Sequence, residues 1–410
     1  MNRYTSHFFT SVGLSLTLVA AIILFAAAPA SGQCTEVVSG LRFALGITQS
    51  NQGNLIVSET GTVVLHTGRI SIVDPNGPSG NRRTLLDGLP SAINDVGQPS
   101  GPAGVFMRGR TLYVAIGIGD GILAGSLGNP TPSSPIFSSI LALHFSANVE
   151  NNTTGFTLTL ADQFTLASGQ TVTLSNGSHK LTVELIANFP NFTLNEPPPG
   201  NVRGSNPFDL VAVGNQLYVT DGGQNTVRRV NIQTGAFSTL VTFPNVPNTT
   251  FPPGGPTVEA VPTGIAYSNG QLLVTLFRGF PFPPVSVVEQ VNPTTGAHAP
   301  FITGLKTAID VFVLTSEDEG DNDGNQTGDH QDVADTDWLV LQHASGPGPM
   351  TPPGRLLRFE TPAGPPTTVA TCMIRPTSMT FDEDSSKLYI TELGPAPAGP
   401  SRVVSVAIAP

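Results

Sequence analysis

The stretch Val213–Asp221, which reads VGNQLYVTD, decides the fold of this chain. It joins a short turn, Val213-Gly214-Asn215-Gln216, to an apolar run of strand type, Leu217-Tyr218-Val219-Thr220-Asp221. Glycine and asparagine supply the positive φ angles that tight β-hairpins need. Similar runs begin at residues 55, 112, 272, 338 and 388, and several of them follow a similar turn. A unit that recurs in this way indicates a repeat architecture.

The spacing of the six runs fits one four-stranded blade of a β-propeller per run, with two longer steps, from 112 to 217 and from 272 to 338. No helical periodicity competes with the strand-like alternation. The sequence therefore predicts an all-β fold, a single six-bladed β-propeller over residues 37–410, closed by the N-terminal strand.

Two insertions account for the longer steps. Residues 147–186 contain three more strand-like runs separated by Asn-Gly and Ser-Gly turns, and we interpret them as a hairpin added to the second blade. A seventh blade is the alternative, but the Leu-Tyr-Val core is absent there. Residues 317–337 form an acidic insertion that interrupts the fifth blade.

Residues 1–32 are expected to be a signal peptide and not part of the fold. Arg3 gives a positive start, Val12–Ala28 is mostly apolar, and small residues around Ala30 offer a cleavage site. The alternative is an uncleaved membrane anchor, since the apolar stretch is rather long. We expect a secreted or periplasmic protein with no further membrane span.

The charge balance restricts the partners. The formal net charge is −11, only 11% of residues are charged, and no basic run exists. Nucleic acid and anionic membrane surfaces are therefore poor partners. We expect a monomer that binds a small molecule or a protein.

Two cysteines, Cys34 and Cys372, lie near opposite ends of the mature chain. In an exported protein the expected state is a disulfide. Closure of a propeller pairs a strand from one terminus with the blade made by the other, which would bring Val37-Val38 beside the last blade. The alternative is two unpaired buried thiols.

The stretch Ser205-Asn206-Pro207-Phe208-Asp209-Leu210, with the LYVTDGGQNTVRRV run from Leu217 to Val230, resembles the NHL-type propeller repeat. With Val261-Pro262-Thr263, Gly279-Phe280-Pro281-Phe282-Pro283 and Ile309-Asp310-Val311, it more narrowly resembles the ScyD/ScyE family of exported bacterial proteins. The likeness runs from about Gly40 to Phe312. It implies a propeller fold and export more firmly than an activity.

Three acids, Glu59, Asp221 and Glu392, end the second strand of their blades. One interpretation is that each accepts hydrogen bonds inside its own blade. The other is a ring of carboxylates at the channel mouth, as in lactonase-like propellers that hold a divalent ion. Such a site would use Glu59, Asn206, Asp209, Asp221 and Asp310, because hard cations prefer oxygen ligands.

The acidic insertion contains half of a calcium-loop pattern. Oxygen-bearing residues alternate from Glu319 through Asp321 and Asp323, and Gly324 supplies the turn; Asp329 would have to replace the glutamate that normally completes the loop. The sequence predicts weak, structural calcium binding here, with a solvated acidic loop as the alternative.

Two phenylalanines, Phe280 and Phe282, lie in a proline-rich loop where both rings are hard to bury in their own blade. They suggest contact with a ligand or partner, together with Asn206, Asp209 and Asp310. The alternative is packing over the channel mouth.

Two functions stay open at this level. The first is a non-catalytic, ScyD/ScyE-like binding propeller, favoured because no nucleophile elbow or zinc-protease motif occurs. The second is a metal-assisted periplasmic enzyme, either a lactone hydrolase or a catalyst that couples aromatic monomers in pigment synthesis.

Overall fold

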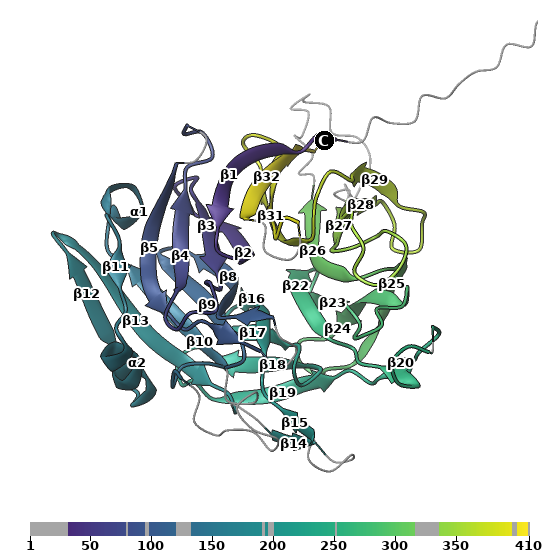
Figure 1. Cartoon of the computed structure of the whole chain (residues 1–410), viewed down its shortest axis with the longest axis horizontal. Coiled ribbons are helices and arrows are strands. Elements are labelled where there is room, and N and C mark those ends of the chain that lie inside the picture. Colours follow the sequence, from purple (N-terminus) through teal and green to yellow (C-terminus); the bar gives the residue numbers. More distant parts are fainter. Residues whose placement is uncertain are drawn as a thin grey trace, which may run out of the picture. The chain divides into compact units, whose positions relative to one another are not determined.

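The structure, a computed structural model, describes residues 32–78, 81–94, 98–119, 133–190, 193–195, 201–250, 252–315, 336–395 and 400–408. Within this part of the chain, six sheets of four or five strands are arranged around a centre as the blades of a β-propeller (Figure 1). The predicted fold class is confirmed. Among the same residues, no helix is both long enough and apolar enough to cross a bilayer.

The four strands of each blade are antiparallel and run from an innermost strand near the axis to an outermost strand at the rim. In this order, blade 1 holds β2 (Ala44–Gln49), β3 (Leu55–Glu59), β4 (Gly68–Val73) and β5 (Arg82–Leu89). Blade 2 holds β8 (Pro102–Arg108), β9 (Thr111–Ile116), β10 (Ser139–Phe145) and β13 (His179–Asn188). Blade 3 holds β16 (Pro207–Val213), β17 (Gln216–Asp221), β18 (Thr226–Asn231) and β19 (Phe237–Thr242).

Blade 4 holds β22 (Pro262–Ser268), β23 (Gln271–Leu276), β24 (Ser286–Val291) and β25 (His298–Leu305). Blade 5 holds β26 (Ala308–Thr315), β27 (Thr336–Gln342), β28 (Arg355–Phe359) and β29 (Thr367–Ala370). Blade 6 holds β30 (Pro376–Asp382), β31 (Lys387–Glu392), β32 (Ser401–Ala407) and, outermost, β1 (Thr35–Leu41).

The N-terminal strand closes the ring. Strand β1 pairs antiparallel with β32, so the first and last strands of the propeller lie side by side (Figure 1). The Cys34–Cys372 disulfide joins the same two ends of the chain, with 5.8 Å between the Cα atoms. The predicted disulfide and the predicted closure are both confirmed.

The recurring Leu-Tyr-Val run forms the second strand of its blade, and its side chains alternate between two neighbouring blades. Leu217 and Val219 pack in a cluster with residues of blade 2, whereas Tyr218, between them, packs in a cluster with residues of blade 4. Both faces of a blade are therefore buried. This explains why the run is apolar at every position instead of alternating with polar residues.

The residue after this run links the blades through its hydroxyl group. Thr275 accepts a hydrogen bond from Gly264 N (2.8 Å) in its own blade and donates to Ile309 O (3.2 Å) in the next. Ser58, Thr220 and Thr391 make corresponding bonds to the inner strands of the blades that follow theirs. In these four blades the fourth position of the repeat thus bonds to the next blade; in the other two it is Ala115 or Leu341.

The insertion at 147–186 is more than an added hairpin. Strands β12 (Val172–Asn176) and β13 do form a hairpin, but β13 is itself the fourth strand of blade 2. The expectation that no helix interrupts the strands is wrong at this point of the chain. Two short helices occur, α1 (Val149–Asn152) and α2 (Leu160–Ala167), and α2 begins with a capping box between Thr159 and Asp162.

The insertion also reaches the neighbouring blade. Strand β11 (Phe156–Thr157) adds in parallel to β5 at the edge of blade 1. Phe156 and Leu166 are buried in the cluster shared by blades 1 and 2. The insertion therefore covers the outer edges of two blades.

Candidate ligand-binding site

The innermost strands of the six blades approach one another around the axis. The third residue of each of these strands contributes to a ring. Each strand begins with a register shift against the second strand of its blade, at the same position in every blade. The third residues of these strands, which we call the ring positions, are Gly46, Gly104, Asp209, Gly264, Asp310 and Ser378. The ring encloses no space large enough for water.

Glycine allows the inner strands to approach closely at this ring. A Cβ atom on Gly264 would lie 2.5 Å from Asp310 Oδ1, and one on Gly104 would lie 2.6 Å from Asp209 Oδ1. Each aspartate in turn bridges to the blade that follows it. Asp209 accepts from Ile265 N (3.1 Å) and Asp310 accepts from Met379 N (2.8 Å).

The two ring aspartates hold their protons unusually tightly. Burial raises the pKa of Asp209 to about 7, although backbone N–H donors oppose the shift. Burial and the neighbouring Asp209 carboxylate raise the pKa of Asp310 well above its usual range. Two carboxyls in one enclosed place disfavour ionisation of both.

Two cavities flank this ring. A cavity of about 240 Å³ is lined by residues that follow the ring positions, such as Ile47 and Val105. A larger one of about 860 Å³ is lined by residues that precede them, such as Leu45, Ala103 and Ile309. We call the larger one the mouth cavity. Its size lies in the range of small-molecule sites.

Aromatic rings form much of the wall of the mouth cavity. Phe280, Phe282, Phe277 and His343 make a chain of edge-to-face contacts, with centroids 6.0, 5.9 and 5.7 Å apart in that order. The chain runs from Phe280, which is 57% exposed, to His343, which is buried. The structure thus places Phe280 and Phe282 at this cavity, with Phe280 exposed and Phe282 half-buried against its neighbours.

Backbone strain is concentrated at the same place. Of the fourteen non-glycine residues with positive φ in the described chain, six line the mouth cavity: Phe43, Val261, Arg278, Phe282, Met350 and Arg375. Bulky and β-branched residues rarely adopt this conformation. Phe43, Val261 and Arg375 each stand directly before an inner strand, where the chain turns into the blade. Strain of this kind clusters at functional sites.

Two arginines and one histidine are among the residues that line the cavity: Arg278, Arg375 and His343. Arg278 is 5% exposed; its Nε donates to Val285 O (3.1 Å), while its buried Nη1 has no hydrogen-bond partner among the described residues. Arg375 donates to Gly394 O through Nε and Nη2. Burial lowers the pKa of both arginines. Glu259 also lines the cavity and is the only carboxylate among its described lining residues.

His343 is neutral in the folded protein. Burial lowers the pKa of His343 to about 4. Its Nδ1 lies 2.9 Å from Pro376 O, and because a carbonyl only accepts, Nδ1 carries the proton. The other nitrogen, Nε2, is then a hydrogen-bond acceptor.

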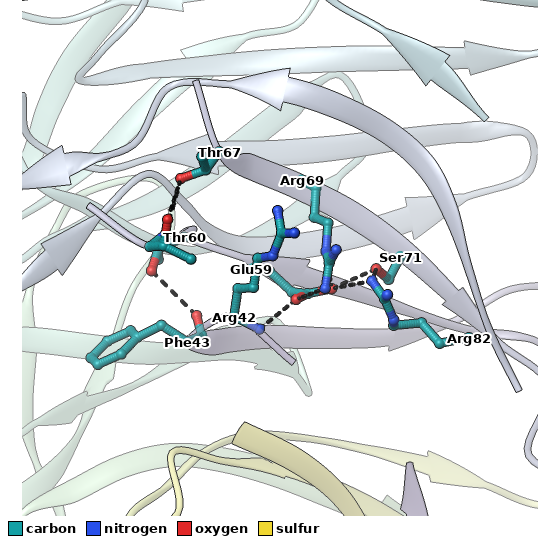
Figure 2. A network of polar contacts seen from close by, with 9 residues as sticks. Arg42, Phe43, Glu59, Thr60, Thr67, Arg69, Ser71 and Arg82 are labelled. Atoms are coloured by element: carbon teal, nitrogen blue, oxygen red, sulfur yellow. Dashed lines mark hydrogen bonds and ion pairs between the residues drawn. The ribbon is translucent and has the colours of Figure 1, made fainter. Parts of the chain in front are cut away.

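The three strand-ending acids are bound within their own blades. Figure 2 shows Glu59, which accepts from Arg42 N, from Arg69 and from Ser71. Arg82 completes the cluster, with its Nη1 3.6 Å from Glu59 Oε1. A fully buried carboxylate with this many donors has its lone pairs satisfied by its own blade.

The other two acids repeat the arrangement. Asp221 accepts from Asn206 N (2.8 Å) and from Arg228 Nε (2.8 Å), and Glu392 accepts from Ile374 N (2.8 Å) and from Arg402. In all three blades the acid holds an arginine of the third strand and a backbone N–H at or near the entrance to the inner strand. These contacts fit the interpretation in which each acid serves its own blade.

The five residues of the metal-assisted hypothesis are therefore not gathered at one point. Asn206 contacts Asp221 and lines the mouth cavity, Asp209 and Asp310 interact electrostatically at the ring, and Glu59 lies in its own cluster. Among the described residues, no group of three or more potential ligands from His, Cys, Asp and Glu could hold a metal ion. Glu319, Asp321, Asp323 and Asp329 of the expected calcium loop lie outside the described residues.

Sequence reasoning did not identify Arg278, Arg375 or His343. They belong to no motif: Arg278 and Arg375 have positive φ angles, and His343 directly follows β27. The one signal near Arg278 was its position beside the Gly279–Pro283 loop.

Comparisons with known proteins support the fold. No protein-family model matches the chain, and neither does any curated protein. Among solved structures, the PQQ-bound aldose sugar dehydrogenase from Streptomyces coelicolor is 14% identical, with a TM-score of 0.49, over 93% of this chain and 99% of that one. Trypanosoma rangeli sialidase, in complex with sialic acid, is 11% identical, with a TM-score of 0.51, over 93% of this chain and 58% of that one. At such identities the likeness is one of fold.

Proposed function

We propose that this protein is an exported, non-catalytic binding propeller of the ScyD/ScyE type, and that it binds a small, largely aromatic molecule in the mouth cavity. The observation that carries the proposal is the cavity itself, about 860 Å³ in volume and lined by five phenylalanines. Aromatic walls with a few convergent polar groups are typical of small-molecule sites.

The strained lining supports the same proposal. A bulky residue held at positive φ costs of order 1–3 kcal/mol and persists only where the surroundings impose it. Six such residues around one cavity indicate that its shape is held in place before a ligand arrives. Preformed walls reduce the ordering cost of binding.

Two further observations support the proposal, the first through export and the second through the family likeness. The Cys34–Cys372 disulfide is typical of oxidising compartments. The Gly279–Pro283 loop, which carries the family likeness, supplies two of the cavity's aromatic rings.

The test is to fill the cavity without disturbing the blades. Gly279 lines the cavity at an ordinary φ, and an added Cβ would meet nothing closer than 3.5 Å. We expect Gly279→Phe to weaken binding of the neutral fluorescent probe N-phenyl-1-naphthylamine at least tenfold, measured by fluorescence titration of the mature chain.

Gly255→Phe is the matched control. Gly255 is exposed, lies at an ordinary φ with nothing within 3.8 Å of an added Cβ except Thr257 O, and does not line the cavity. It should bind the probe as the wild type does. Absence of probe binding by the wild type, or equal binding by the Gly279→Phe variant, would overturn the proposed site.

A further inference from the structure

Arg278 is a buried cation with an unmet hydrogen-bonding group. Its side chain is 5% exposed, its Nε is engaged by Val285 O, and its Nη1 has no partner among the described residues. Leaving a buried donor unpaired is costly, and more so for a charged group. Buried polar groups without partners in a native protein call for a specific explanation.

The charges around Arg278 leave room for one negative partner. Glu289 attracts the guanidinium but is itself hydrogen-bonded to His298 (3.0 Å). The cavity wall adds Arg375 as a second cation and Glu259 as the one carboxylate among its described residues. His343 is neutral. The described lining therefore contains two arginines and one glutamate among mostly apolar residues.

We propose that the mouth cavity selects monoanionic ligands, specifically an aromatic or other apolar body that bears one carboxylate, and that this carboxylate pairs with Arg278. The proposal rests on the proposed function and names the chemical class of its ligand. Arginine N–H groups match carboxylate oxygens in a charge-assisted hydrogen bond. The aromatic chain from Phe280 to His343 covers the body of the ligand.

A dianion such as a phosphate monoester fits less well. Each further buried charge adds a desolvation cost that only a matched partner offsets. Arg375 already donates two hydrogen bonds to Gly394 O, and Glu259 would repel a second negative charge. One carboxylate balances the excess of one arginine over the single glutamate in the described lining.

The experiment compares two ligands that differ only in charge. In the wild type, 2-naphthoate and 2-naphthamide compete with N-phenyl-1-naphthylamine at pH 7. We expect naphthoate to bind at least tenfold more tightly than naphthamide. Arg278→Gln should remove this preference, so that naphthoate and naphthamide compete with the probe about equally well.

Arg110→Gln is the matched control, because it removes the same charge from an exposed turn between β8 and β9. It should keep the full preference. Should the Arg278→Gln variant fail to fold by thermal melting, Arg278→Lys keeps a cation and is expected to retain a preference smaller than tenfold.

The outcomes separate the two proposals. If the neutral probe binds but naphthoate and naphthamide compete equally, or if the preference survives in Arg278→Gln, the assignment to Arg278 is wrong and the cavity remains a binding site. If the neutral probe does not bind at all, the proposed function itself fails.

Discussion

The buried aspartates Asp209 and Asp310 influence each other electrostatically at the ring, and this makes stability depend on pH. An aspartate whose pKa is raised by folding binds its proton more tightly in the folded state than in the unfolded state. Its contribution to stability is full below the unfolded value of 3.8 and is lost as pH rises to the folded value, about 7 for Asp209.

We therefore expect Asp209→Asn to change the pH dependence of stability. Asparagine can still accept from Ile265 N but has no proton to lose. The melting temperature of the variant relative to the wild type should rise between pH 4.5 and pH 7.5. The corresponding free-energy slope is at most about 1.4 kcal/mol per pH unit for one proton. Thermal melts across this range measure it.

Asp384→Asn, in an exposed turn, is the control and should leave the pH dependence as it is in the wild type. A difference between Asp209→Asn and the wild type that stays flat with pH would contradict the raised pKa.

The sequence singles out Asp209 and Asp310 but does not reveal that they lie at one ring. Their contact with a ligand or a metal stays a prediction; the structure places Asp209 and Asp310 at the ring, where they also line the smaller cavity. A sequence shows which strand carries an acid, but not the bulge that turns it toward the axis. Arg278 was missed for a related reason, since its place depends on a positive φ that no residue type announces.

Within the strands, a hydroxyl group that follows the Leu-Tyr-Val core in four of the six blades hydrogen-bonds one blade to the next. Thr275→Val keeps the shape of the side chain but leaves Gly264 N and Ile309 O without this partner. Unsatisfied buried groups of this kind cost about 1–3 kcal/mol each. We expect a loss of about 2 kcal/mol of unfolding free energy, measured by denaturant titration.

Thr173→Val, on the exposed face of β12, is the control and should change stability by less than about 0.5 kcal/mol. An equal effect of the two substitutions would show that the blade-to-blade bond contributes little.

The sequence predicts the blades because the same strand pattern recurs six times. It does not predict the helices and the short strand of the insertion, because each of these elements occurs once. The Leu-Tyr-Val runs sit on the second strands as expected, since both of their faces are buried. Helix α2 spans only eight residues, too few for a clear helical period, although Thr159 and Asp162 form a readable cap. The two-residue strand β11 has no sequence signal, because its partner β5 comes from another blade.

For the molecule as a whole, the Cys34–Cys372 disulfide joins two residues that are 338 positions apart in the sequence. The loop-closure model assigns such a bond about 5 kcal/mol of destabilisation of the unfolded chain. We expect the Cys34→Ser, Cys372→Ser double variant to melt about 5 °C lower than the oxidised wild type. Calorimetric scans with and without reductant measure this.

The chain contains two cysteines, and the double variant lacks both, so reductant has no disulfide to break in it. The double variant therefore serves as the control. Reductant should lower the melting temperature of the wild type and leave that of the double variant unchanged. Identical melting of the reduced and oxidised wild type would contradict a stabilising role.

The position of β1 has a consequence for the order in which the protein is made. Synthesis proceeds from the N-terminus, so the first strand of the propeller is produced first, while its partner β32 is produced last. Until Ser401–Ala407 emerges, β1 has an unpaired edge that any other strand could join. The newborn chain thus stays open to mispairing until the other strands of the propeller have been made, and β32 completes the circle.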